Sequence, residues 1–247
     1  MKLKQRNYLV MCLILSIGFL NANTVSGKVK YNGKKPKPKK LNMSADAMCG
    51  KMHSGPVYNE SFVLNKEGYM KNVIVWIKNA PKTSVPKSPV TLDQVGCQYK
   101  PHVTGIMKGQ NLVIKNSDKT IHNIHSMADK NSNFNFAMPI NSDDRIKSFS
   151  KTEDPFYIKC DVHPWMKSWI FVLEHKYWAT TNRNGEYSID LTGLKPGTYD
   201  LCFWQEKWDK TMQKTGYCSE KYSQSITITK DGDVTANYSF TKPKKKK

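Results

Sequence analysis

Apolar and polar residues alternate along most of this chain, which is typical of β-strands with one face in a core. Val25–Tyr31 alternates in this way, Asn72–Ile77 is apolar after its first residue like a buried strand, and Gly105–Lys115 contains another strand. Asn65–Gly68 predicts a hairpin turn, and the three prolines of Ala80–Pro89 predict an extended loop. Helical periodicity is weak throughout, so we predict an all-β chain.

Residues 155–173 predict two strands around a tight loop. Both ends of this segment are aromatic and β-branched, which favours strands. In the loop, Cys160, His163 and Met166 lie three residues apart. A helix could present the same spacing, but Pro164 would break it. The loop can therefore turn three side chains toward one point.

His122 is expected to reach the same point from a separate strand, after the polar turn Asn116–Lys119. One thiolate, two imidazoles and a thioether form the ligand set of blue copper, with two His and one Cys in a plane and a weak axial Met. A single buried Cys or Met is usually a packing residue, but together these four residues predict a type 1 copper site. We interpret His125 as a surface strand residue.

Three further histidines, His53, His102 and His175, stand alone with no partner at ligand spacing. A copper enzyme would need additional histidines for a catalytic copper, so the sequence argues against an enzyme. Trp165 is interpreted as a hydrophobic shield over the metal or as a packing residue.

The segment KCDVHPWMKSWIFV, residues 159–172, resembles the Cys-x-x-His-Pro-aromatic-Met loop of amicyanin-like cupredoxins. GQNLVIKNSD and IHNIHS, within residues 109–126, resemble the other ligand segment of that family. The resemblance implies a Greek-key sandwich that holds copper through four ligands, namely His122, Cys160, His163 and Met166.

The same resemblance implies roles for three neighbouring groups. Asn123 would brace the ligand loop through hydrogen bonds, and His125 would be a neighbour of the site without binding the metal. The edge of His163 would be exposed and would serve as the exit for the electron.

Residues 25 to about 210 resemble secreted bacterial proteins of a methylamine-utilisation-protein-like family. Alternating segments at 180–189, 194–204, 225–229 and 234–240 are similar to a carboxypeptidase regulatory-like domain, a small prealbumin- or Ig-like sandwich. That family's Trp-His-Glu-Lys segment reads Trp-Gln-Glu-Lys here, so any role of its histidine is absent.

These patterns divide the chain into four parts. We expect a signal peptide at residues 1–24 and a cupredoxin domain with an N-terminal elaboration at residues 25–175. A regulatory-like β domain would follow at residues 176–241, and a basic tail at residues 242–247. The basic residues before Tyr8 and the thirteen-residue apolar run to Leu20 are typical of a signal peptide and too short to span a bilayer. No transmembrane segment is expected after its removal.

Six cysteines fit an exported protein. One lies in the signal segment, and Cys160 is the expected thiolate. Cys49, Cys97, Cys202 and Cys218 allow three pairings. Proximity favours Cys202 with Cys218, which leaves Cys49 with Cys97, and we expect a periplasmic or secreted location.

The chain carries 39 basic and 20 acidic residues, a net charge of +19, with clusters at Lys34–Lys40 and Lys242–Lys247. The export segment and the lack of a recognition motif argue against nucleic-acid binding. We expect a one-electron carrier between redox partners such as a c-type cytochrome or a dehydrogenase, with contact to an anionic surface through the basic tails. The alternatives are copper binding or delivery without rapid electron transfer, and a cell-surface β module.

Overall fold

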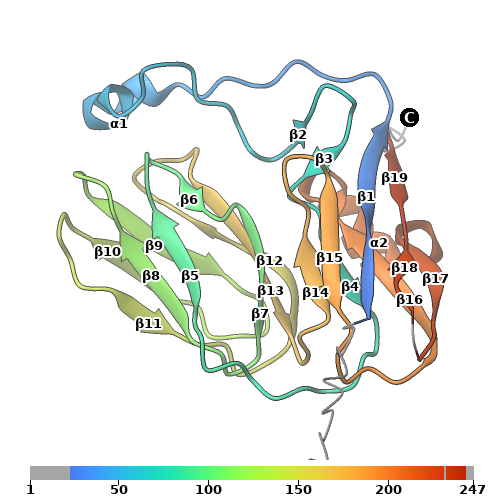
Figure 1. Cartoon of the computed structure of the whole chain (residues 1–247). Coiled ribbons are helices and arrows are strands. Elements are labelled where there is room, and N and C mark those ends of the chain that lie inside the picture. Colours follow the sequence, from blue (N-terminus) through green and yellow to red (C-terminus); the bar gives the residue numbers. More distant parts are fainter. Residues whose placement is uncertain (1–22, 231, 243–247) are drawn as a thin grey trace, which may run out of the picture.

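The computed structural model describes residues 23–230 and 232–242. It is an all-β molecule, as predicted, in which two β-sandwiches pack side by side (Figure 1). Most of the predicted signal peptide (1–24) and of the basic tail (242–247) lies outside the described residues. Among the residues described, no helix has the length and apolar character needed to cross a membrane.

The first sandwich contains the predicted ligand loop. Its two sheets have the orders β10-β9-β12-β13-β7 and β11-β8-β5-β6, and β13 runs parallel to β7 as β5 does to β8. Its strands are β5 (Val90–Gln94), β6 (Tyr99–Lys100), β7 (Val103–Met107), β8 (Leu112–Asn116), β9 (His122–Met127), β10 (Asn135–Met138), β11 (Arg145–Lys147), β12 (Glu153–Lys159) and β13 (Lys167–Leu173).

The second sandwich combines strands from both ends of the chain. One sheet has the order β15-β1-β18, with β19 also on β1, and the other has the order β14-β4-β16-β17. Its strands are β1 (Thr24–Asn32), β4 (Ile74–Ile77), β14 (Trp178–Thr180), β15 (Glu186–Asp190), β16 (Gly197–Trp204), β17 (Ser223–Ile228), β18 (Val234–Thr235) and β19 (Tyr238–Thr241). The predicted hairpin pairs β2 (Val63–Leu64) with β3 (Met70–Lys71).

The strand pairing differs from the expected division of the chain at residue 175. We placed the N-terminal strands in the cupredoxin domain, but β1 pairs with β15 and β4 pairs with β14 and β16. The buried side chains of β1 and β4 share one core with those of the C-terminal strands. That shared core, rather than closeness in sequence, determines which sandwich these strands join.

Strand β13 joins the two sandwiches because both of its faces are buried. Ile170 and Val172 lie in the core of the first sandwich, whereas Trp169 and Phe171 lie in the core of the second. The ring centroids of Trp169 and Trp204 are 5.0 Å apart. A strand buried on both faces needs a continuous apolar run, which explains the sequence of this segment.

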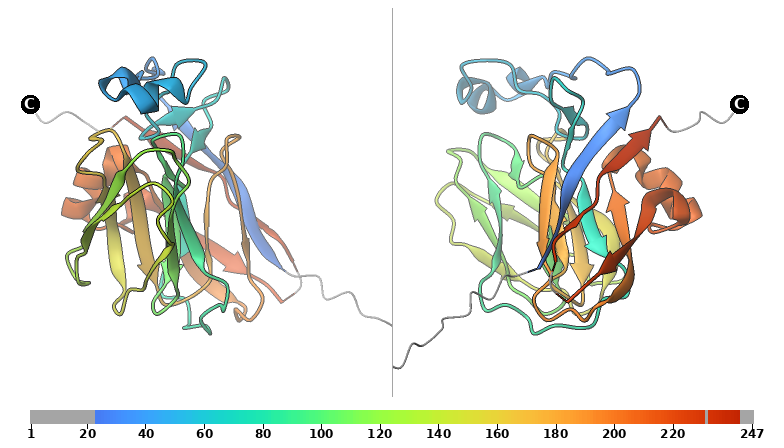
Figure 2. Two further views of the ribbon diagram at one scale, coloured as in Figure 1. Left: turned by 90° about the vertical axis from the view of Figure 1, so that its left-hand side faces the viewer. Right: turned by 45° about the vertical axis from the view of Figure 1, so that its right-hand side comes forward.

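A short helical segment crosses above one end of the first sandwich (Figures 1 and 2). The helical elements are η1 (Met43–Ala45), α1 (Ala47–Lys51), η2 (Glu206–Trp208), α2 (Asp209–Thr215) and η3 (Glu220–Tyr222). A disulfide between Cys49 and Cys97 ties α1 to the turn before β6, and a second joins Cys202 to Cys218. The first disulfide holds α1 over the ligand loop.

Candidate metal centre

Three donor side chains converge at the end of the first sandwich that α1 covers. His122 begins β9, and Cys160 and His163 lie in the loop between β12 and β13. Their donor atoms lie within 4.8 Å of one another, and all three residues are buried. The two Nδ1 atoms are 3.0 Å apart, and Sγ of Cys160 is 3.8 Å from Nδ1 of His163.

The alternation of β9 decides which of its histidines faces the cluster. His122, Ile124 and Ser126 are buried, whereas Asn123 and His125 face the other side of the strand. His125 pairs there with Asp161 of the ligand loop, with Nδ1 2.9 Å from Oδ2. The structure therefore places His125 outside the cluster.

The amide of Asn123 connects β9 to the ligand loop. Its Oδ1 accepts a hydrogen bond from the backbone N–H of Asp161 at 3.1 Å. Its Nδ2 donates to Asn135 Oδ1 and to the carbonyl of Phe136 on β10. These bonds fix the loop immediately after Cys160.

Cys160 is a buried cysteine that forms no disulfide. Burial raises the pKa of its thiol, but hydrogen bonds from His122 and from backbone N–H groups outweigh burial and lower that pKa below its usual range. The N–H of His163 lies 3.3 Å from Sγ. Since the thiolate is the form that binds metals, this environment favours the form that binds.

Two carboxylates that the sequence analysis missed contact the imidazoles. Asp118 Oδ2 lies 2.8 Å from Nε2 of His122, and Asp46 Oδ2 lies 3.1 Å from Nε2 of His163. Asp118 stands four residues before His122 in the polar turn, so its proximity could have been noticed. Asp46 lies 117 residues from His163, and no sequence pattern connects them.

The pKa values of these carboxyl groups follow from their partners. The hydrogen bond from His163, with those from two backbone N–H groups of α1, lowers the pKa of Asp46. Burial raises the pKa of Asp118, but hydrogen bonds from His122 and from the N–H groups of Cys97 and Gly96 lower it by more. Both groups are thus held as carboxylates.

The expectation that His163 has an exposed edge is wrong, because only 1% of the residue is accessible. Asp46 covers its Nε2, and the Cys49 sulfur of the disulfide lies 3.6 Å from the same atom. The ring of Trp165 lies 5.1 Å away between centroids, and its Nε1 donates to the carbonyl of Cys97. Segment α1 and its disulfide therefore cover the edge of the His163 ring that the resemblance predicted to be exposed.

Met166 ends the ligand loop and is 1% exposed. Its N–H donates to the carbonyl of His163 at 2.9 Å, and its own carbonyl accepts from the N–H of Cys160 at 3.3 Å. The side chain belongs to the core of the first sandwich. The turn thus brings the backbones of all three loop residues together.

The remaining histidines have other partners. Nε2 of His53 bonds to the carbonyl of Gly96, and Nε2 of His102 lies 2.7 Å from Oε2 of Glu206 between the sandwiches. Burial lowers the pKa of His175.

Two other groups of possible donors in the described chain each include Cys49 or Cys97, whose sulfurs are bonded to each other. The cluster around Cys160 is therefore the candidate metal centre.

No family model matches this chain, and no curated protein matches it. Solved structures similar to it include a copper-containing nitrite reductase, a purple cupredoxin and amicyanin. A copper-containing nitrite reductase from Thermus scotoductus SA-01 is 22% identical, over 38% of this chain and 25% of that chain, with a TM-score of 0.33. A purple cupredoxin from Nitrosopumilus maritimus is 22% identical, over 34% of this chain and 99% of that chain, with a TM-score of 0.29. A mutant of amicyanin is 15% identical, over 40% of this chain and 98% of that chain, with a TM-score of 0.30.

The chain spans only a quarter of the length of that nitrite reductase. At these identities and TM-scores the likeness carries no inference about activity. The assignment of the metal centre therefore depends on the donor atoms of the chain itself.

Proposed function

We propose that this protein is an exported type 1 copper protein that carries one electron at a time between redox partners. The observation that carries this proposal is the buried convergence of one free thiol and two imidazoles, from His122, Cys160 and His163. This donor set fits blue copper, and the thioether of Met166 would be a fourth, weaker ligand. Bound copper would accept one electron and release it again.

The residues around the cluster would hold this geometry in both oxidation states. Asn123 anchors the ligand loop to β9, and the disulfide to Cys97 holds α1 over His163. Water is kept away because the three donors are buried. A site that changes little between oxidation states exchanges electrons with little reorganisation, which is what a carrier needs.

We also propose a role in carrying electrons rather than in catalysis, in an exported compartment. Two disulfides fit an oxidising environment. The exposed Lys34–Lys40 segment and the net charge of +19 would attract a partner with an acidic surface, such as a c-type cytochrome or a dehydrogenase. The regulatory-like C-terminal strands would act as a spacer or a docking surface.

The visible spectrum of the mature chain titrated with Cu(II) tests the proposal. We expect an intense thiolate-to-copper band that is lost in Cys160→Ser and in His122→Ala. His125→Ala is the matched control, since this histidine lies on the same strand and faces away from the cluster. A folded but colourless protein would refute the copper assignment.

A second function, copper binding without rapid electron transfer, is favoured by one observation. The imidazole edge of His163 is covered by Asp46 and the Cys49 sulfur, so a partner would meet α1 instead of a ligand. Electron self-exchange separates the two functions. Fast exchange with a reversible potential supports the carrier, whereas slow exchange at an intact copper site supports copper binding alone.

A further inference from the structure

The two imidazoles of the candidate centre share one arrangement. Each directs Nδ1 toward the other ring, at 3.0 Å, and Nε2 toward a carboxylate. The carboxylate is Asp118 for His122 and Asp46 for His163, at 2.8 and 3.1 Å. Since a carboxylate accepts a hydrogen bond from Nε2–H, each ring presents Nδ1 as the nitrogen that would bind a metal.

Both carboxylates are held by backbone N–H groups that the Cys49–Cys97 disulfide connects. Oδ1 of Asp46 accepts from the N–H groups of Met48 and Cys49 at the start of α1, which leaves Oδ2 for His163. Cys49 is bonded to Cys97, and the N–H of Cys97 donates to Asp118 at 2.7 Å. The disulfide therefore links the support of one imidazole to the support of the other.

A carboxylate bonded to a ligand imidazole acts on the metal through that ring. It makes the imidazole a stronger donor, and its negative charge favours the more positive oxidation state. Cu(II) would be stabilised relative to Cu(I). The effect should be larger for Asp118, whose side chain is 4% exposed, than for Asp46, which is 29% exposed and more screened by solvent.

We propose that Asp46 and Asp118 are positioning residues that orient the two imidazoles and lower the reduction potential of the bound copper. This inference rests on the proposed function. It assigns to the α1 segment a role in setting the potential, in addition to covering the site.

Asp46→Asn separates this role from helix capping. Asparagine is as good an N-cap as aspartate, so α1 keeps its start, but the carboxylate that accepts from Nε2 of His163 is gone. Losing such a partner typically costs about tenfold in metal affinity. A tenfold loss confined to Cu(II) raises the one-electron potential by about 59 mV. Asp118→Asn should raise it further.

Asp161→Asn is the matched control. Its carboxylate is next to Cys160 in sequence but pairs with His125 and Lys159 instead of a ligand imidazole. We expect the reduction potential of Asp161→Asn to differ from that of the unmodified protein by only a small fraction of the shift seen in Asp46→Asn. The potentials are measured by voltammetry on copper-loaded proteins, with urea unfolding to check that each variant is folded.

The possible outcomes distinguish failure of the positioning role from failure of the proposed copper function. If the unmodified chain forms no thiolate-copper band, the proposed function fails. If the band is present but Asp46→Asn leaves the potential unchanged, the positioning role is wrong. An equal rise in Asp161→Asn would also overturn it, because the effect would then be general charge. If Asp118→Asn fails to fold, Asp46→Asn and its control still decide.

Discussion

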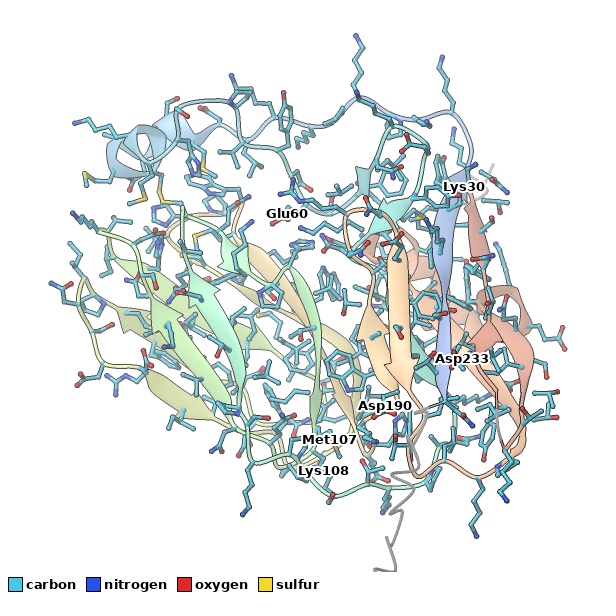
Figure 3. All side chains as sticks on the ribbon, in the orientation of Figure 1. Lys30, Glu60, Met107, Lys108, Asp190 and Asp233 are labelled. Atoms are coloured by element: carbon cyan, nitrogen blue, oxygen red, sulfur yellow. A yellow bond between two sulfur atoms is a disulfide. The ribbon has the colours of Figure 1, made fainter. Side chains whose placement is uncertain are left out.

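Glu60 connects the β2–β3 hairpin to the first sandwich through a partly buried ion-pair network. Its Oε1 accepts from Lys71 of β3 at 2.7 Å, and its Oε2 accepts from Lys100 of β6 at 2.8 Å. Figure 3 labels Glu60 in the region between the two halves. The side chain is only 14% exposed. Burial raises the pKa of Glu60, but the two lysines outweigh it and lower that pKa from 4.5 to about 2.

This shift in pKa has a direct consequence for stability. One pKa unit corresponds to about 1.4 kcal/mol, so a fall from 4.5 to about 2 stabilises the folded state by about 3 kcal/mol at neutral pH. Because the folded pKa lies below the unfolded one, this stabilisation is fully present above about pH 4.5 and is lost as the pH falls toward 2.

Glu60→Gln therefore should lower the free energy of unfolding by about 3 kcal/mol at neutral pH and by about 1.5 kcal/mol near pH 3. Urea unfolding followed by tryptophan fluorescence at both pH values measures the difference. Glu186→Gln is the matched control, since Glu186 pairs with Lys28 at an exposed, solvent-screened site and its loss should change the stability little at either pH. A loss in Glu60→Gln that is the same at both pH values would refute the reasoning.

Three further outcomes are expected. Replacing both Cys202 and Cys218 by Ser opens a loop of sequence separation 16 and should cost about 3 kcal/mol in urea unfolding, while the visible spectrum stays unchanged because this disulfide lies in the other sandwich. Gly105→Ala would place Cβ 2.7 Å from the Trp178 ring and should cost about 1–3 kcal/mol in thermal unfolding; an unchanged midpoint would contradict this. Copper at about 100 times its dissociation constant should raise the unfolding free energy by about 2.7 kcal/mol, an increase that calorimetry should not find in Cys160→Ser.

The sequence by itself determined the local parts of this protein. Alternating residues predicted the strands, and the prolines of residues 80–89 predicted a loop, because side-chain period and turn chemistry act over a few residues. The spacing of Cys160, His163 and Met166 placed three side chains in one tight loop, which the structure contains between β12 and β13. The alternation of β9 likewise separates His122 from His125.

Only the tertiary structure decided how distant segments meet. Strand β1 joins the C-terminal strands because its buried face completes their core, and α1 covers His163 because a disulfide of sequence separation 48 holds it there. Asp46 and Glu206 reach His163 and His102 across more than one hundred residues. No local pattern encodes such contacts, since they depend on which buried faces and which charges find each other when the whole chain packs.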